Sequence, residues 1–175
     1  MTDDRLRIAP ANALLIDAFG RVAESVPEVL AGLTLDELAW RPGPDANPIG
    51  WLVWHLTRVL DDHLADVSGL EQVWTSQGYA ARASLPLADS EIGYGHSSEQ
   101  VGLVHVPGEL LAAYFTAVLS HFTPYLRDAA DWERIVDRRW DPPVTLAVRL
   151  VSLVDECARH IGQAQYVKGL LPTRT

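Results

Sequence analysis

The chain contains a single cysteine, Cys157, so it can form neither an intrachain disulfide nor a metal site built from several thiolates. Lysine is nearly absent too, because Lys168 is the one lysine among 14 basic residues. The 23 acidic residues give a net charge of −9, which argues against binding to a nucleic-acid backbone.

Long apolar runs are also missing. No segment approaches the roughly 18 uninterrupted apolar residues of a membrane span, so we expect no contact with a membrane. The N-terminus is acidic and carries no apolar stretch, which predicts no signal peptide and a cytoplasmic protein. With 48% hydrophobic and 21% charged residues, the composition is globular, and 175 residues fit one domain over positions 1–175.

Apolar residues recur at three- and four-residue spacings in four long segments, as in amphipathic helices. The predicted helices run from about Ala11 to Leu30, from Pro48 to Val67, from Pro107 to Arg127 and from Val144 to Gly169. We expect Pro27 to kink or shorten the first helix, Asn47 to cap the second, and Gly169 to end the last.

The segment from Leu70 to Pro107 is the least regular part of the chain, although Glu71 to Ala83 is compatible with a short helix. Connections this long are usually functional or cross a bundle. No alternation of β-branched residues suggests a sheet. The sequence therefore predicts an all-α protein, a four-helix bundle with a long irregular connection between its second and third helices.

Three residues suggest a metal site. His55 lies in a Trp-rich apolar run, and Glu156 and His160 are four apart on the last predicted helix. That spacing places two side chains within about 40° of each other, one turn apart. Together with a ligand from another helix, such a pair forms a three-ligand site with an open position. Two alternatives remain open: a solvated polar face on the last helix, and a core histidine bonded to a backbone carbonyl.

Two motifs together resemble the DinB-like superfamily of metal-binding four-helix bundles. The first is the run from Asn47 to Leu56, and the second is the run from Glu156 to Gln163. The superfamily includes the N-terminal domain of mycothiol-dependent maleylpyruvate isomerase and the mycothiol and bacillithiol S-transferases. The resemblance extends to Trp40-Arg41-Pro42 and to the run from Tyr166 to Leu170. It implies an up-down-down-up order of helices.

The resemblance also implies that His55, Glu156 and His160 bind a divalent metal. Many members have histidine at the position of Glu156, whereas the isomerase branch has glutamate. Two imidazoles and a carboxylate suit zinc, nickel, iron or manganese, and zinc is the ion we expect.

The function implied is that of a metal-dependent transferase or isomerase that uses a low-molecular-weight thiol, with mycothiol as the best candidate. The open metal position would deprotonate the thiol, which would attack a small electrophilic substrate. One alternative is a non-catalytic, stress-associated metal-binding protein that forms a homodimer. Another is a metal-free bundle that holds an apolar ligand.

Further residues are candidates for binding the thiol cofactor or the substrate. Arg58 and Arg149 lie one or two turns from proposed ligands and could hold a carboxylate, although surface arginine is the commoner role. Gln163 follows His160 by three and could line the cavity. We expect His63 to miss the site, because it lies about 80° around the helix from the second-helix ligand.

Overall fold

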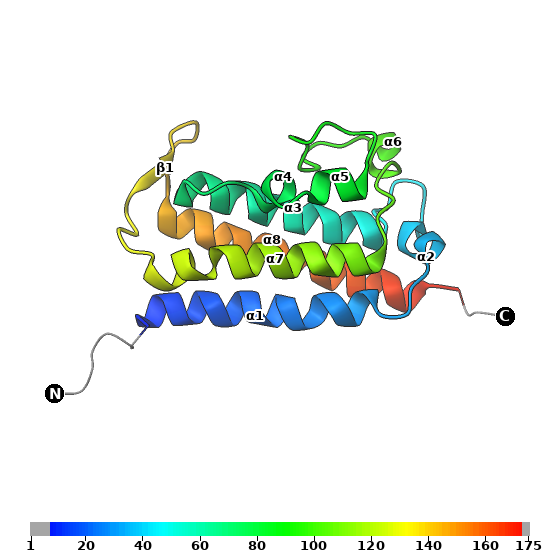
Figure 1. Cartoon of the computed structure of the whole chain (residues 1–175), viewed down its shortest axis with the longest axis horizontal. Helices are drawn as coiled ribbons and strands as arrows, with labels where there is room; N and C mark the ends of the chain where they lie inside the picture. Colours follow the sequence, from blue (N-terminus) through cyan, green and yellow to red (C-terminus); the bar gives the residue numbers. More distant parts are fainter. Residues whose placement is uncertain (1–7, 173–175) are drawn as a thin grey trace.

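The computed structural model describes residues 8–172 of the chain. Four long helices run alongside one another (Figure 1), namely α1 (Pro10–Leu30), α3 (Ile49–Ser68), α7 (Gly108–Asp128) and α8 (Leu146–Leu170). Helix α3 packs against α7 and α8, and α1 packs against the same two helices. The prediction of a predominantly helical protein is confirmed.

Six short elements complete the described part of the chain. They are the helices α2 (Leu35–Ala39), α4 (Val73–Ser76), α5 (Tyr79–Ala83) and α6 (Ser98–Val101), and the strands β1 (Ile135–Asp137) and β2 (Val144–Thr145). The strands pair antiparallel in a small hairpin that the sequence did not predict. Strands of three and two residues are too short to show the alternation on which such a prediction depends.

The helix ends differ from expectation at three points. Helix α3 begins at Ile49 with Pro48 at its N-cap, so Asn47 is not the cap. Helix α8 begins two residues late because Val144 and Thr145 pair with β1, and the Thr145 side chain then accepts a bond from the Val148 amide. At its other end, α8 continues through position 169 to Leu170.

Helix α1 continues past Pro27 to Leu30, although a proline has no N–H to donate to the Ala23 carbonyl. The Pro27 carbonyl accepts a hydrogen bond from the Ala31 amide, which closes the last turn of the helix. The short helix expected over residues 71–83 is divided into α4 and α5. The break falls at Gly78, whose φ of +73° is a conformation that glycine adopts without strain.

Helix α3 is enclosed by its neighbours, and 16 of its 20 residues are buried. The irregular connection of residues 70–107 folds back over it, as the green segment in Figure 1 shows. Helix α3 therefore has no extended solvated face. Its buried polar side chains, among them His55, Arg58 and Asp61, must find partners inside the protein.

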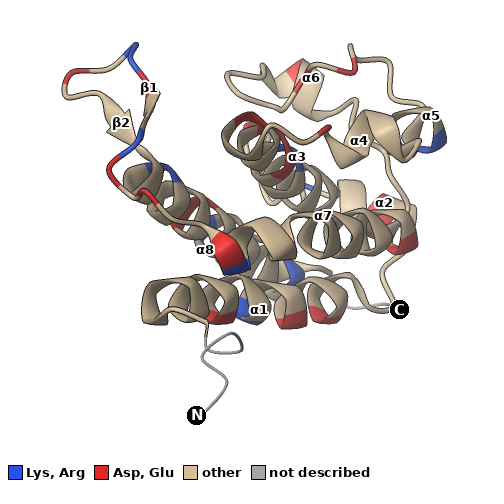
Figure 2. Ribbon diagram, turned by 60° about the vertical axis from the view of Figure 1, so that its left-hand side comes forward, with Lys and Arg blue, Asp and Glu red and all other residues tan. Residues whose placement is uncertain are grey.

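None of the helices within residues 8–172 combines the length and apolar character needed to cross a membrane. Lysine and arginine positions are dispersed among the more numerous acidic ones along the ribbon (Figure 2).

Candidate metal centre

The three predicted ligands come together between α3 and α8. His55 projects from α3, and Glu156 and His160 project from adjacent turns of α8. One carboxylate oxygen, Glu156 Oε1, lies 3.2 Å from His55 Nε2 and 3.0 Å from His160 Nε2. All three potential ligand atoms lie within 4.8 Å of one another. In a tetrahedral zinc site with bonds of about 2.1 Å, ligand atoms are about 3.4 Å apart, so this spacing is close to what an ion requires.

Both imidazole rings are oriented by hydrogen bonds on the side away from this point. His55 Nδ1 bonds to the backbone carbonyl of Ile92, and His160 Nδ1 lies 2.7 Å from the side-chain oxygen of Gln163. The Ile92 carbonyl can only accept, so it favours a proton on Nδ1 of a neutral His55 ring, and the Gln163 side-chain oxygen favours the same tautomer of His160. The Nε2 lone pairs of both rings therefore point toward one carboxylate oxygen. Three acceptors in this arrangement need a proton or a cation between them.

The electrostatics of the cluster agree with that arrangement. Hydrogen bonds with His160 and His55 hold the pKa of Glu156 well below its usual range. Burial opposes ionisation of His160, but hydrogen bonds to Glu156 and Gln163 raise the pKa of its ring nevertheless. Both shifts favour an ionised carboxyl on Glu156 and a protonated ring on His160. Such a pair can exchange its proton for a metal ion.

The cluster is sealed on the α3 side and open on the α8 side. The His55 side chain is 8% exposed, whereas that of Glu156 is 33% exposed. Trp51 stacks on the His55 ring with centroids 4.4 Å apart. Gly93 also lies close to this ring: its φ is +93°, and a Cβ atom there would lie 2.5 Å from His55 Nδ1. Only glycine allows the backbone to approach the ring this closely.

A cavity of about 210 Å³ adjoins the open side. Its wall includes His55, Glu156, His63, Tyr94, Arg149 and Ser152. Two of the proposed ligands therefore face a space in which a small molecule could reach them.

The sequence model of the DinB superfamily matches residues 18–164. The chain belongs to the DinB superfamily. A crystal structure described as the conserved protein of locus from Enterococcus faecalis is similar over 93% of this chain and 97% of that chain, with 31% identity and a TM-score of 0.86. No curated protein matches the chain.

Membership in the DinB superfamily confirms the resemblance, and members of this superfamily are often metal-binding. Of the three further candidates in this DinB protein, two lie near the cluster. Arg149 forms part of the cavity wall and bonds to Asp137 Oδ2 at 3.1 Å. Gln163 does not reach into the cavity but holds the His160 ring.

Arg58 lies elsewhere. Its side chain is fully enclosed and is bonded to protein groups, so it offers no donor to a ligand in the cavity. His63 lies outside the cluster of the three candidate ligands, but it lines the adjoining cavity, because this space extends along α3 beyond the ligands. The contacts of Ile92 and Gly93 with His55 were not predicted. The only feature of the sequence that could have indicated these contacts is the glycine-rich stretch in the long connection.

Proposed function

We propose that the protein binds a divalent metal ion through His55, Glu156 and His160. The observation that carries this proposal is the direction of the two imidazole rings. Each is held through Nδ1, so that both Nε2 lone pairs meet at Glu156 Oε1. This is the way in which metal-ligating histidines are usually held by their outer partners.

The donor set favours a transition metal over calcium or magnesium. Two imidazole nitrogens and a carboxylate oxygen suit zinc, nickel, iron and manganese, and zinc is the expected ion. Cys157 adds no fourth ligand, because it is fully buried and burial raises the pKa of its thiol. Structural zinc sites usually have four protein ligands, so three ligands beside a cavity support a site with a reactive open position.

We further propose that the protein is a transferase or isomerase that uses a low-molecular-weight thiol of the mycothiol type on a small electrophile. When bound, the ion would supply a position at which the thiol loses its proton. The protein's own residues would do the rest. Arg149 would pair with a carboxylate of the thiol or the substrate, while Trp51 and Ile92 would exclude water behind His55.

The test uses protein purified without a histidine tag. Elemental analysis should find about one divalent ion per chain, and metal removal should abolish conjugation of mycothiol to a generic electrophile. His160→Ala should lose both the ion and the activity, because two remaining ligands hold an ion weakly. His105→Ala, which removes an exposed histidine outside the cluster, is the matched control and should retain both.

Two outcomes would count against the proposal in different ways. Equal conjugation rates with and without metal would support the alternative of a non-catalytic metal-binding protein. Protein that takes up no ion after incubation with zinc, nickel, iron or manganese would refute the metal site itself.

A further inference from the structure

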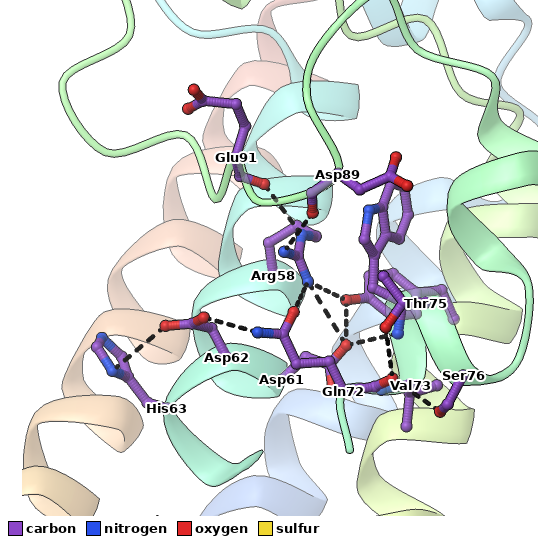
Figure 3. Close-up of polar contacts among 12 residues, drawn as sticks. Arg58, Asp61, Asp62, His63, Gln72, Val73, Thr75, Ser76, Asp89 and Glu91 are labelled. Carbon is purple, nitrogen blue, oxygen red and sulfur yellow. Dashed lines mark hydrogen bonds and ion pairs between the residues drawn. The ribbon is translucent and has the colours of Figure 1, made fainter. Parts of the chain in front are cut away.

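Arg58 lies one turn after His55 on α3, and its guanidinium holds the connection that covers this helix (Figure 3). Its Nε donates to the Glu91 carbonyl at 3.1 Å, and its Nη2 donates to the Asp89 carbonyl at 3.1 Å. Nη1 donates to the side-chain oxygen of Gln72 at 3.0 Å. A planar guanidinium has donors spaced to bond two neighbouring carbonyls at once, which the single ammonium of lysine cannot do with the same geometry.

The charge of Arg58 is balanced where it lies. Asp61 Oδ2 is 3.6 Å from its Nη1, and both side chains are completely buried. Tyr114 donates to the same carboxylate oxygen at 2.7 Å, and the Val73 and Trp74 amides also donate to this carboxylate. The buried pair is thus fully bonded, so Arg58 can hold its two carbonyls without leaving an unpaired charge.

The segment 89–93 therefore contacts α3 at two successive turns. Arg58 fixes the carbonyls of Asp89 and Glu91, and the next carbonyl, that of Ile92, accepts from His55 Nδ1. Gly93 then passes close to the same ring. One peptide unit separates the carbonyl that Arg58 holds from the carbonyl that orients the imidazole.

We propose that Arg58 is a positioning residue for the metal centre: by holding segment 89–93 it keeps the Ile92 carbonyl on His55 Nδ1, and so keeps Nε2 free for the metal. The proposal deepens the proposed function and rests on it. Without the guanidinium, the Ile92 carbonyl loses its nearest fixed support. The His55 ring then carries its proton on Nε2 in part of the molecules, and that form cannot bind metal.

The first test compares Arg58→Lys with Tyr114→Phe. In the metal-free wild type, ¹⁵N NMR of the His55 ring should show a proton on Nδ1 alone when the ring is neutral. Arg58→Lys should show both tautomers and should bind Zn²⁺ about 10- to 100-fold more weakly, the usual effect of losing an outer partner. Tyr114→Phe removes a hydroxyl that accepts from Arg58 Nη1 at 3.3 Å but leaves the Nε and Nη2 bonds to both carbonyls in place, so it should leave the tautomer and the Zn²⁺ affinity unchanged.

A second variant covers the case in which Arg58→Lys does not fold. The double substitution Arg58→Gln/Asp61→Asn removes both buried charges together, which avoids an unpaired ion. It should give the same mixed tautomers of His55. The wild-type tautomer ratio in either folded variant would overturn the proposal.

A third comparison tests the contact between Gly93 and the His55 ring. Gly93→Ala places a Cβ atom 2.5 Å from His55 Nδ1, whereas Gly95→Ala has a similar positive φ, +72°, and meets nothing within 4 Å. Gly93→Ala should therefore disturb the tautomer and weaken Zn²⁺ binding, and Gly95→Ala should do neither. Equal effects would mean that backbone strain, and not contact with the ring, governs His55.

These readouts separate the two proposals. The tautomer is measured without metal, so a wild type that binds no Zn²⁺ would refute the proposed function while the NMR result still decides whether Arg58 positions the ring.

Discussion

Zinc added to the metal-stripped protein should raise its melting temperature, because the proposed ligands meet only in the folded chain. His55 and Glu156 are about 100 positions apart in sequence and belong to different helices. Closing a loop of that length costs the unfolded chain about 4 kcal/mol, from (3/2)RT ln n. The unfolded chain should therefore bind zinc at all three ligands roughly 1,000-fold more weakly than the native state.

The size of the effect follows from this preference. At a free zinc concentration about 100 times the native Kd, binding stabilises the folded state by about 2.7 kcal/mol, with little offset from the unfolded chain. For a domain of this size, each kcal/mol shifts the melting temperature by about 2–4 °C. We therefore expect a rise of about 5–11 °C, measured by thermal unfolding followed by circular dichroism across a zinc series.

Two variants distinguish the site from nonspecific binding. His160→Ala should show little shift at the same zinc concentrations, while His105→Ala should shift as the wild type does. A wild-type melting temperature that does not respond to zinc, or an equal shift in His160→Ala, would refute this reasoning.

Three further predictions concern the same groups. Tyr114→Phe removes the buried hydrogen bond from the Tyr114 hydroxyl to the Asp61 carboxylate, so it should lower the free energy of unfolding by about 2 kcal/mol, as measured by urea titration. A loss under about 0.5 kcal/mol would contradict the bonded network. Glu156→His keeps three ligands and should retain zinc, whereas Glu156→Ala should not, as elemental analysis can check. The pKa of Glu156 is lowered and that of His160 is raised in the metal-free protein, so their pairing should stabilise it most between about pH 4.5 and 6.5. Below this range, the stability difference between wild type and Glu156→Gln should shrink as the pH falls through the folded-state pKa of the Glu156 carboxyl. Above this range, the difference should shrink as the pH rises through the folded-state pKa of the His160 imidazole. A stability difference that does not depend on pH would contradict the pairing.

The proximity of Glu156 and His160 could be predicted from the sequence because it depends on local spacing. The i,i+4 relation of Glu156 and His160 is a property of any helix, and the apolar neighbours of His55 indicate that its helix is buried. Resemblance to the family then joined two segments that periodicity alone could not bring together.

The role of Arg58 could not be predicted, because it depends on where an irregular connection lies. Helical periodicity shows which face of α3 carries Arg58, but nothing in the sequence shows that the backbone of residues 89–93 folds back onto that face. The same limit applies to Gly93. A glycine is required there because the backbone lies close to His55, a residue far away in the sequence. The β1–β2 hairpin could not be predicted because its strands are very short.

The two sides of the proposed site differ in how freely they can evolve. His55 belongs to a helix that is enclosed almost throughout, so a change there disturbs close packing. Glu156 and His160 lie on α8 beside a cavity, and both are only partly buried. Single substitutions at these two positions can alter the ligand set while leaving the core intact. At the proposed site, a change of metal preference would therefore need only single substitutions on α8 and no repacking of α3.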